Sequence, residues 1–117
     1  MNAQRPPPDF PTDEPLELME GHLADPSLWT PQVARRLAQA EEIGLNPLHW
    51  QVLWWLRRIF EEQGLPPRKK VLIQWFADHY DLTHREAHQR LTTLFPKGLL
   101  LQAGRIAGLP QGFLSCI

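Results

Sequence analysis

Helix start signals recur along this chain and leave little room for any fold that is not mainly helical. Thr30-Pro31 and Asn46-Pro47 each place proline after an N-cap residue, at the first helical position, where its missing N–H is not needed. Thr83, followed three residues later by Glu86, has the spacing of a capping box. Gly64 stands where a left-handed cap would end a helix. The chain is therefore predicted to be all-α from residue 30 onward.

Five helices follow from these signals and from apolar residues at helical spacing. The predicted segments are residue 31 to Gly44, 47–63, about 67–80, 83–94 and a short one over 99–107. The third and fourth are joined tightly and have helix-turn-helix proportions. Ahead of them, Leu16–Leu23 is compatible with a small β-hairpin that has Gly21 near its turn.

The apolar faces of the two central helices are rich in tryptophan. The predicted face of the second helix is Trp50, Leu53, Trp54, Leu56 and Phe60, and that of the third is Val71, Leu72, Trp75, Phe76 and His79. Trp54 and Trp55 are adjacent, so both cannot face one core. We expect one of them to be partly exposed.

Composition narrows the functional class. A chain of 117 residues with 43% apolar content suits a single domain. The longest apolar run has only five residues, and no apolar segment follows the N-terminal Arg5, so we expect neither a membrane span nor secretion. One cysteine forms no internal disulfide, which suits the cytoplasm. A net charge of −1 argues against strong, direct nucleic-acid binding.

The charge is distributed unevenly. Residues 1–26 hold one arginine and six acidic residues, a net charge of −5, which leaves +4 for the rest. Five prolines in residues 1–15 disfavour helix and sheet pairing there. We predict an acidic Pro-rich arm over 1–15 that is disordered or loosely docked, a helical domain over 16–110 and a flexible C-terminal arm over 111–117.

Cys116 is the most distinctive candidate for chemistry. It is the only thiol, it is penultimate, and it follows the helix-breaking Gly108-Leu109-Pro110. From position alone it is either an incidental cysteine or a reactive sulfur on a swinging arm of about 23 Å reach. Lys97 and Arg105 flank the base of the tail and would favour the thiolate, whereas the C-terminal carboxylate opposes it.

Other clusters favour structural roles. His84 and His88 share one helix face, but a metal site needs further ligands, so we interpret them as solvated and predict no metal. His49 is interpreted as a structural or capping histidine. A DNA-binding role through Arg85 and Arg90 on the helix-turn-helix-like pair is the alternative from another class, a regulatory or adaptor protein.

A set of motifs from residue 29 onward resembles the TusE/DsrC family of sulfur-relay proteins. The matching positions are Trp29, Leu45, His49-Trp50, Arg57, Pro66-Pro67, Leu94–Gly98, Gln102-Ala103, Ile106–Pro110 and Cys116-Ile117. The resemblance implies a mainly α domain with a small N-terminal hairpin, a helix-turn-helix-like portion and a mobile C-terminal arm. It also implies that Cys116 carries sulfur as a persulfide.

The resemblance extends to partners. It implies a sulfur donor such as a TusBCD-like complex and an acceptor such as a tRNA 2-thiouridylase, with no metal or organic cofactor. The protein would be a sulfur-relay carrier rather than a free-standing turnover enzyme. Phe113 and Leu114 would anchor the arm in a partner groove.

Two departures refine this expectation. Gly104 occupies the position of the second arm cysteine of DsrC proteins, which favours the single-cysteine, TusE-like branch. Leu99 replaces a family proline and is expected to extend the fifth helix. DsrC-like sulfur trafficking in sulfur oxidation, without tRNA, stays open as an alternative.

Overall fold

The computed structural model describes residues 18–19, 22–23 and 25–109 of the chain. Its elements are β1 (Leu18–Met19), β2 (His22–Leu23), the 3-10 helix η1 (Pro26–Leu28), α1 (Pro31–Ala40), α2 (Pro47–Gln63), α3 (Lys69–His79), α4 (His84–Leu94) and α5 (Leu101–Ile106). The predicted mainly helical class is confirmed. The two arms predicted over 1–15 and 111–117 lie outside the described residues.

The predicted caps form as hydrogen bonds. The Asn46 side chain accepts from the N–H groups of Leu48 and His49 at 2.9 and 3.2 Å, and His49 Nδ1 accepts from Asn46 N–H at 3.0 Å. Thr83 and Glu86 make the reciprocal pair at 3.1 and 2.9 Å. Both α2 and α4 therefore start with capping boxes, the first of them built with histidine instead of glutamate.

Three helix ends differ from the prediction. The first helix stops at Ala40, well before Gly44, because Glu42 already has a left-handed φ of 62°. The third begins at Lys69, since Arg68 is still extended. The fifth covers only Leu101–Ile106. Leu99 does not extend it; its side chain is instead buried in the turn ahead of α5.

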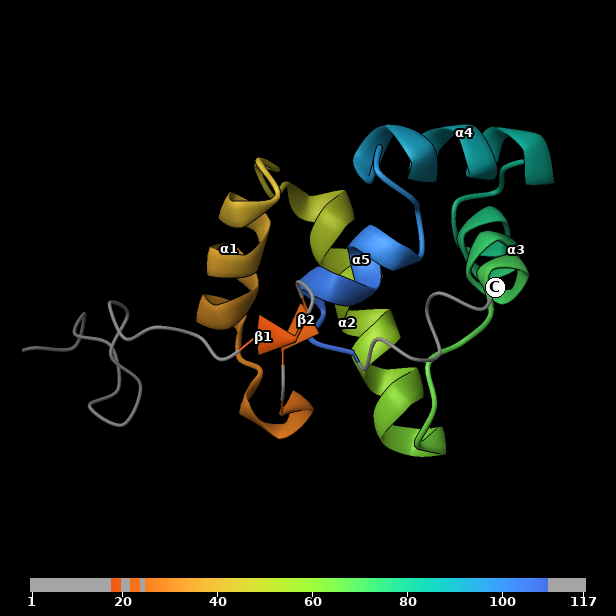
Figure 1. Cartoon of the computed structure of the whole chain (residues 1–117). Helices are drawn as coiled ribbons and strands as arrows, with labels where there is room; N and C mark the ends of the chain where they lie inside the picture. The colour runs from red at the N-terminus through yellow and green to blue at the C-terminus, as the bar shows by residue number, and fades with distance from the viewer. Residues whose placement is uncertain (1–17, 20–21, 24, 110–117) are drawn as a thin grey trace, which may run out of the picture.

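Helix α5 lies at the centre of the fold, in contact with α1, α2 and β2, while α3 and α4 pack together as the helix-turn-helix-like pair (Figure 1). Its buried positions are Gln102, Ala103, Gly104 and Ile106. Strands β1 and β2 pair antiparallel, with Leu18 opposite Leu23, which is the predicted hairpin. The last helix of the domain is thus packed inside its core.

The core-facing sides of α2 and α3 correct the predicted apolar faces. Helix α2 buries Val52, Leu53, Trp55 and Leu56, and α3 buries Leu72, Ile73, Phe76 and Ala77. Trp54 is 50% exposed, which confirms that one of the adjacent tryptophans faces solvent. Val71 and His79 are exposed, because α3 packs its Ile73 and Ala77 side against the core instead. Trp75 lies at the border of the core, where its ring stacks on that of Trp55 with the centroids 4.6 Å apart. None of the helices in the described part of the chain has the length and apolarity to cross a bilayer.

Candidate functional site at the root of the C-terminal arm

The backbone is fixed up to the last described residue, Leu109. Gly108 takes a left-handed φ of +73° after α5. Its N–H donates to the Arg105 carbonyl at 3.1 Å, and the Leu109 N–H donates to the Gly104 carbonyl at 2.9 Å. This is a Schellman-type helix end with a buried leucine after the glycine. We call this hydrogen-bonded turn at Gly108-Leu109 the root, because the sequence that leads to Cys116 continues from it.

Trp29 packs directly against this root. A Cβ at Gly108 would lie 2.6 Å from Trp29 Cδ1, so only glycine fits beside the indole ring. The indole Nε1–H donates to the Ile106 carbonyl at 2.8 Å. Trp29, from the segment ahead of α1, thus provides the hydrogen-bond donor for a carbonyl at the end of α5 and fills the space beside Gly108.

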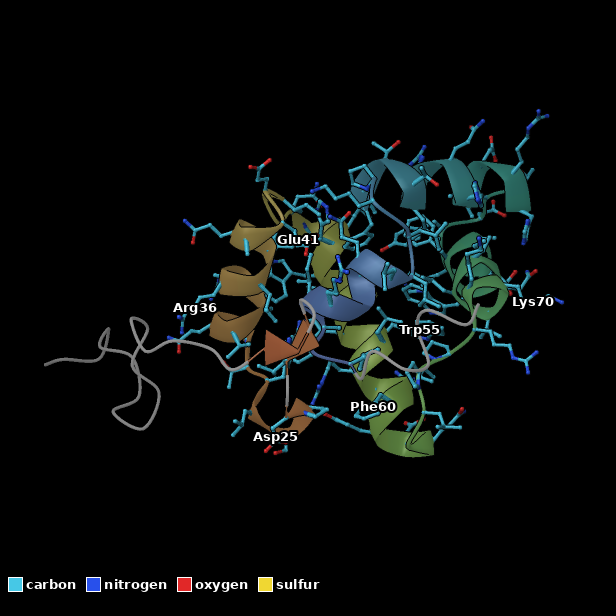
Figure 2. The ribbon with its side chains drawn as sticks, viewed as in Figure 1. Asp25, Arg36, Glu41, Trp55, Phe60 and Lys70 are labelled. Carbon is cyan, nitrogen blue, oxygen red and sulfur yellow. The ribbon has the colours of Figure 1, made fainter. Side chains whose placement is uncertain are left out.

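Arg57 of α2 holds the same helix end from another side. Its guanidinium donates to the Ala107 carbonyl at 3.2 Å and pairs with Glu61 at 3.1 Å. It lies over the ring of Trp29, 4.9 Å from the centroid, and 5.8 Å from that of Phe60, whose place on α2 Figure 2 labels. The side chain is only 8% exposed, and its buried Nε has no hydrogen-bond partner among the residues that the structure describes. A positive charge is therefore held at the C-terminal end of α5.

In the sequence Arg57 stands out only as part of a family motif, and the motif predicts no role for it. An arginine within a helix that also carries acidic residues usually indicates a solvated face. The carbonyl that Arg57 bonds also lies fifty residues away along the chain, so no local pattern shows the contact. The one available signal was its position among apolar neighbours, Leu56 on one side and Phe60 one turn later.

The two cations predicted to flank the tail occupy different ends of α5. Arg105 lies in its last turn, close to the root, and pairs with Glu41 at 3.5 Å. Lys97 lies before its first turn, with an exposed side chain. Gln102 connects them: its amide oxygen accepts from Lys97 N–H at 3.0 Å, and its amide nitrogen donates to Glu41 at 2.9 Å. Glu41 directly follows α1 (Figure 2).

The remaining predicted site residues, Cys116, Phe113 and Leu114, lie outside the described residues. His49 is buried and, besides its capping bond, donates from Nε2 to the Leu94 carbonyl at 2.9 Å, which confirms a structural role. His84 and His88 are exposed, as a solvated face requires. Within the described segments, no three His, Cys, Asp or Glu side chains group to hold a metal ion.

Among the ionisable groups of the described residues, two that lie away from the root have shifted pKa values. The Ser27 hydroxyl and backbone N–H, which both donate to Asp25, lower the pKa of that exposed carboxyl. Partial burial raises the pKa of the Tyr80 phenol. Asp25 caps η1 and Tyr80 caps α3, so both shifts reflect local structure and no reacting centre.

Comparison with known proteins gives concordant matches. Residues 13–117 match the family described as DsrC like protein. The sulfurtransferase TusE of Photorhabdus laumondii is 36% identical over 92 residues, covering 79% of this chain and 82% of the relative. TusE of Escherichia coli K12 is 35% identical, covering 79% and 84%.

Solved structures agree. The oxidized γ-subunit of dissimilatory sulfite reductase (DsrC) from Archaeoglobus fulgidus superposes with a TM-score of 0.72 at 32% identity, covering 82% of this chain and 88% of that one. The NMR structure of Allochromatium vinosum DsrC gives a TM-score of 0.70 at 33% identity, covering 78% and 80%. Fold and sequence therefore point to the same group of proteins.

Proposed function

Because this chain belongs to the DsrC-like protein family, we propose that it carries sulfane sulfur as a persulfide on Cys116 and passes it to an acceptor protein. Its relatives named sulfurtransferase TusE support a sulfur-relay role. The observation that carries the proposal is the fixed root at Gly108-Leu109, followed seven residues later by the only thiol of the chain.

The chemistry needs no cofactor. The Cys116 thiolate attacks the outer sulfur of a donor persulfide, a new S–S bond forms, and the donor's S–S bond breaks. The donor leaves as a thiolate that takes up the persulfide proton, so no oxidant or reductant is consumed. In the second transfer, an acceptor thiolate attacks the outer sulfur of the Cys116 persulfide, and Cys116 leaves as a thiolate.

The geometry suits delivery between two partners. A rigid root fixes where the arm begins, and seven extended residues reach about 23 Å from it. That length is enough to enter a pocket on another protein while the helical body stays outside. Phe113 and Leu114 would contact the walls of such a pocket, and Lys97 and Arg105 would face an acidic rim.

Mass spectrometry after incubation with a persulfide donor tests the carrier function. We expect the intact chain to gain the mass of one sulfur atom and Cys116→Ser to gain none. A wild-type chain that stays unmodified, under conditions that load another single-cysteine carrier, would disprove the proposal.

We further propose that the pathway is 2-thiolation of the tRNA wobble uridine in the cytoplasm, with a TusBCD-like donor and a tRNA 2-thiouridylase as acceptor. A single cysteine supports this branch, because Gly104 lies buried inside α5 where DsrC proteins carry their second arm cysteine. The near-neutral charge suits a carrier that leaves tRNA binding to the acceptor.

The pathway is testable in cells that lack their own TusE. Expression of this chain should restore 2-thiouridine in tRNA, and Cys116→Ser should not. If persulfide loading occurs in vitro but tRNA thiolation is not restored while the partners are present, sulfur trafficking without tRNA becomes the better assignment.

A further inference from the structure

An aromatic strip runs along a partly exposed side of α2, at the edge of the core. Trp50, Trp54 and Arg58 recur every four residues and therefore lie on one helix face. Trp54 is 50% exposed, Trp50 is half-buried, and the Arg58 side chain is 71% exposed. Exposed tryptophans of this kind are enriched where proteins bind partners.

Helix α1 completes this surface. The Arg35 guanidinium lies 5.3 Å from the ring centroid of Trp50, over a hollow of about 170 Å³ that is also lined by Ile43 and Leu45. The rings of Trp50 and Trp54 are 6.5 Å apart and tilted by 31°. We call Arg35, Trp50, Trp54 and Arg58 the tryptophan surface.

The chemistry of the tryptophan surface selects its ligand. Grooves lined by aromatic rings bind polyproline II segments, because proline rings pack on indole faces and the extended backbone is already ordered. Two arginines flank the strip, Arg35 beside Trp50 and Arg58 beyond Trp54, and they favour acidic residues next to those prolines. Arg58 already pairs with Glu62 at 3.6 Å, but both side chains are exposed and such a pair exchanges readily. A proline-rich acidic peptide fits both requirements.

The chain contains such a peptide. Residues 5–17 read RPPPDFPTDEPLE, with five prolines and four acids. Its first eight residues precede the DsrC-like match, which starts at residue 13. The charge of −5 over residues 1–26 complements the +4 of the remainder.

The chain runs from this segment through the hairpin to Trp29, which contacts the tryptophan surface. The segment ends at β1, whose Leu18 pairs with Leu23, and Leu23 is six residues before Trp29. Trp29 contacts Trp54 edge-on at 5.3 Å. Ten residues of polyproline II, from Leu18 back to Pro8, span about 31 Å. A short tether of this kind gives an effective concentration in the millimolar range, so even a weak contact is populated.

We propose that residues 5–17 bind the tryptophan surface of their own chain, with Pro6-Pro7-Pro8 against Trp50 and Trp54 and the acids toward Arg35 and Arg58. The segment would shield this face from other proline-rich or acidic partners. Because Trp29 touches both Trp54 and the end of α5, the occupied surface is continuous with the arm root. The inference does not depend on the proposed sulfur transfer.

Side-chain NMR of the ¹⁵N-labelled full chain tests the proposal. The five indole N–H signals are compared between the wild type and a variant with Pro6, Pro7 and Pro8 changed to serine, a change outside the described fold. We expect the signals of Trp50 and Trp54, assigned with Trp50→Phe and Trp54→Phe, to shift, and those of Trp55 and Trp75 to stay.

A reciprocal variant checks the charge contacts. Arg35→Glu should move the backbone signals of Asp9 and Asp13 toward their positions in the triple-serine variant, whereas Val71→Ala, an exposed apolar control on α3, should not. High salt should reproduce the Arg35→Glu change. Identical Trp50 and Trp54 signals in the wild type and the triple-serine variant would overturn the proposal. So would shifts that depend on protein concentration, because they would assign this surface to a second copy of the chain.

Discussion

Arg57 shows how one buried charge can stabilise a functional root. Its guanidinium bonds the Ala107 carbonyl while its charge is compensated by Glu61 and by the faces of Trp29 and Phe60. We expect Arg57→Met to lower the free energy of unfolding by about 1.5–3 kcal/mol, the range for a hydrogen bond to a charged group. Urea denaturation measures it. The neighbouring Arg58→Met is the control, because that side chain is 71% exposed and should change stability by less than about 0.5 kcal/mol.

Gly108 allows a second residue-level test, with Gly44 as its match. Gly108→Ala would combine a positive φ with a Cβ 2.6 Å from Trp29, and we expect it to destabilise by about 2 kcal/mol or more. A Cβ at Gly44 would have no atom within 4 Å, and the backbone there does not have a positive φ. Gly44→Ala should therefore leave the free energy of unfolding unchanged or raise it by up to about 1 kcal/mol. Equal effects of the two substitutions on thermal or urea unfolding would contradict the described geometry.

At the scale of elements, Gln102 ties three segments together. Its buried amide bridges the turn at Lys97 and the Glu41 carboxylate that follows α1, which in turn pairs with Arg105. Gln102→Leu keeps the volume but leaves the Lys97 N–H without its partner. We expect a loss of about 1–3 kcal/mol in urea unfolding. The exposed Gln74, which bonds only Asp78, is the control, and Gln74→Leu should have little effect.

The elements also show what the sequence could predict. The starts of α2 and α4 were predictable because their caps are local: Asn46, Thr83 and Glu86 act within three residues of the backbone groups that they bond. The starts of α3 and α5, which have no side-chain cap, were predicted about two residues too early. The buried side of α3 was not, because it depends on how Trp55 and Trp75 stack across two helices. The left-handed turn at Glu42 escaped prediction because that conformation usually belongs to glycine.

At the scale of the whole molecule, the fold class and the family were predictable, but the construction of the arm root was not. Family motifs such as Ile106–Pro110 are contiguous in the sequence and can be recognised without a structure. The root instead assembles Trp29, Arg57 and Gly108 from three distant segments. Only tertiary packing reveals that these residues act on the same helix end.

This arrangement predicts that stability and sulfur chemistry are separable. Cys116 follows the fixed root by seven residues, so we expect Cys116→Ser to leave the urea unfolding midpoint unchanged while it abolishes persulfide loading. Gly108→Ala should do the reverse: it destabilises the body, yet a small-molecule persulfide should still load the thiol at the wild-type rate under folded conditions. A marked loss of stability in Cys116→Ser would show instead that the thiol is packed in the body, because a thiol that packs contributes contacts that serine cannot replace. In that case a donor would have to draw the arm out before any sulfur could be exchanged.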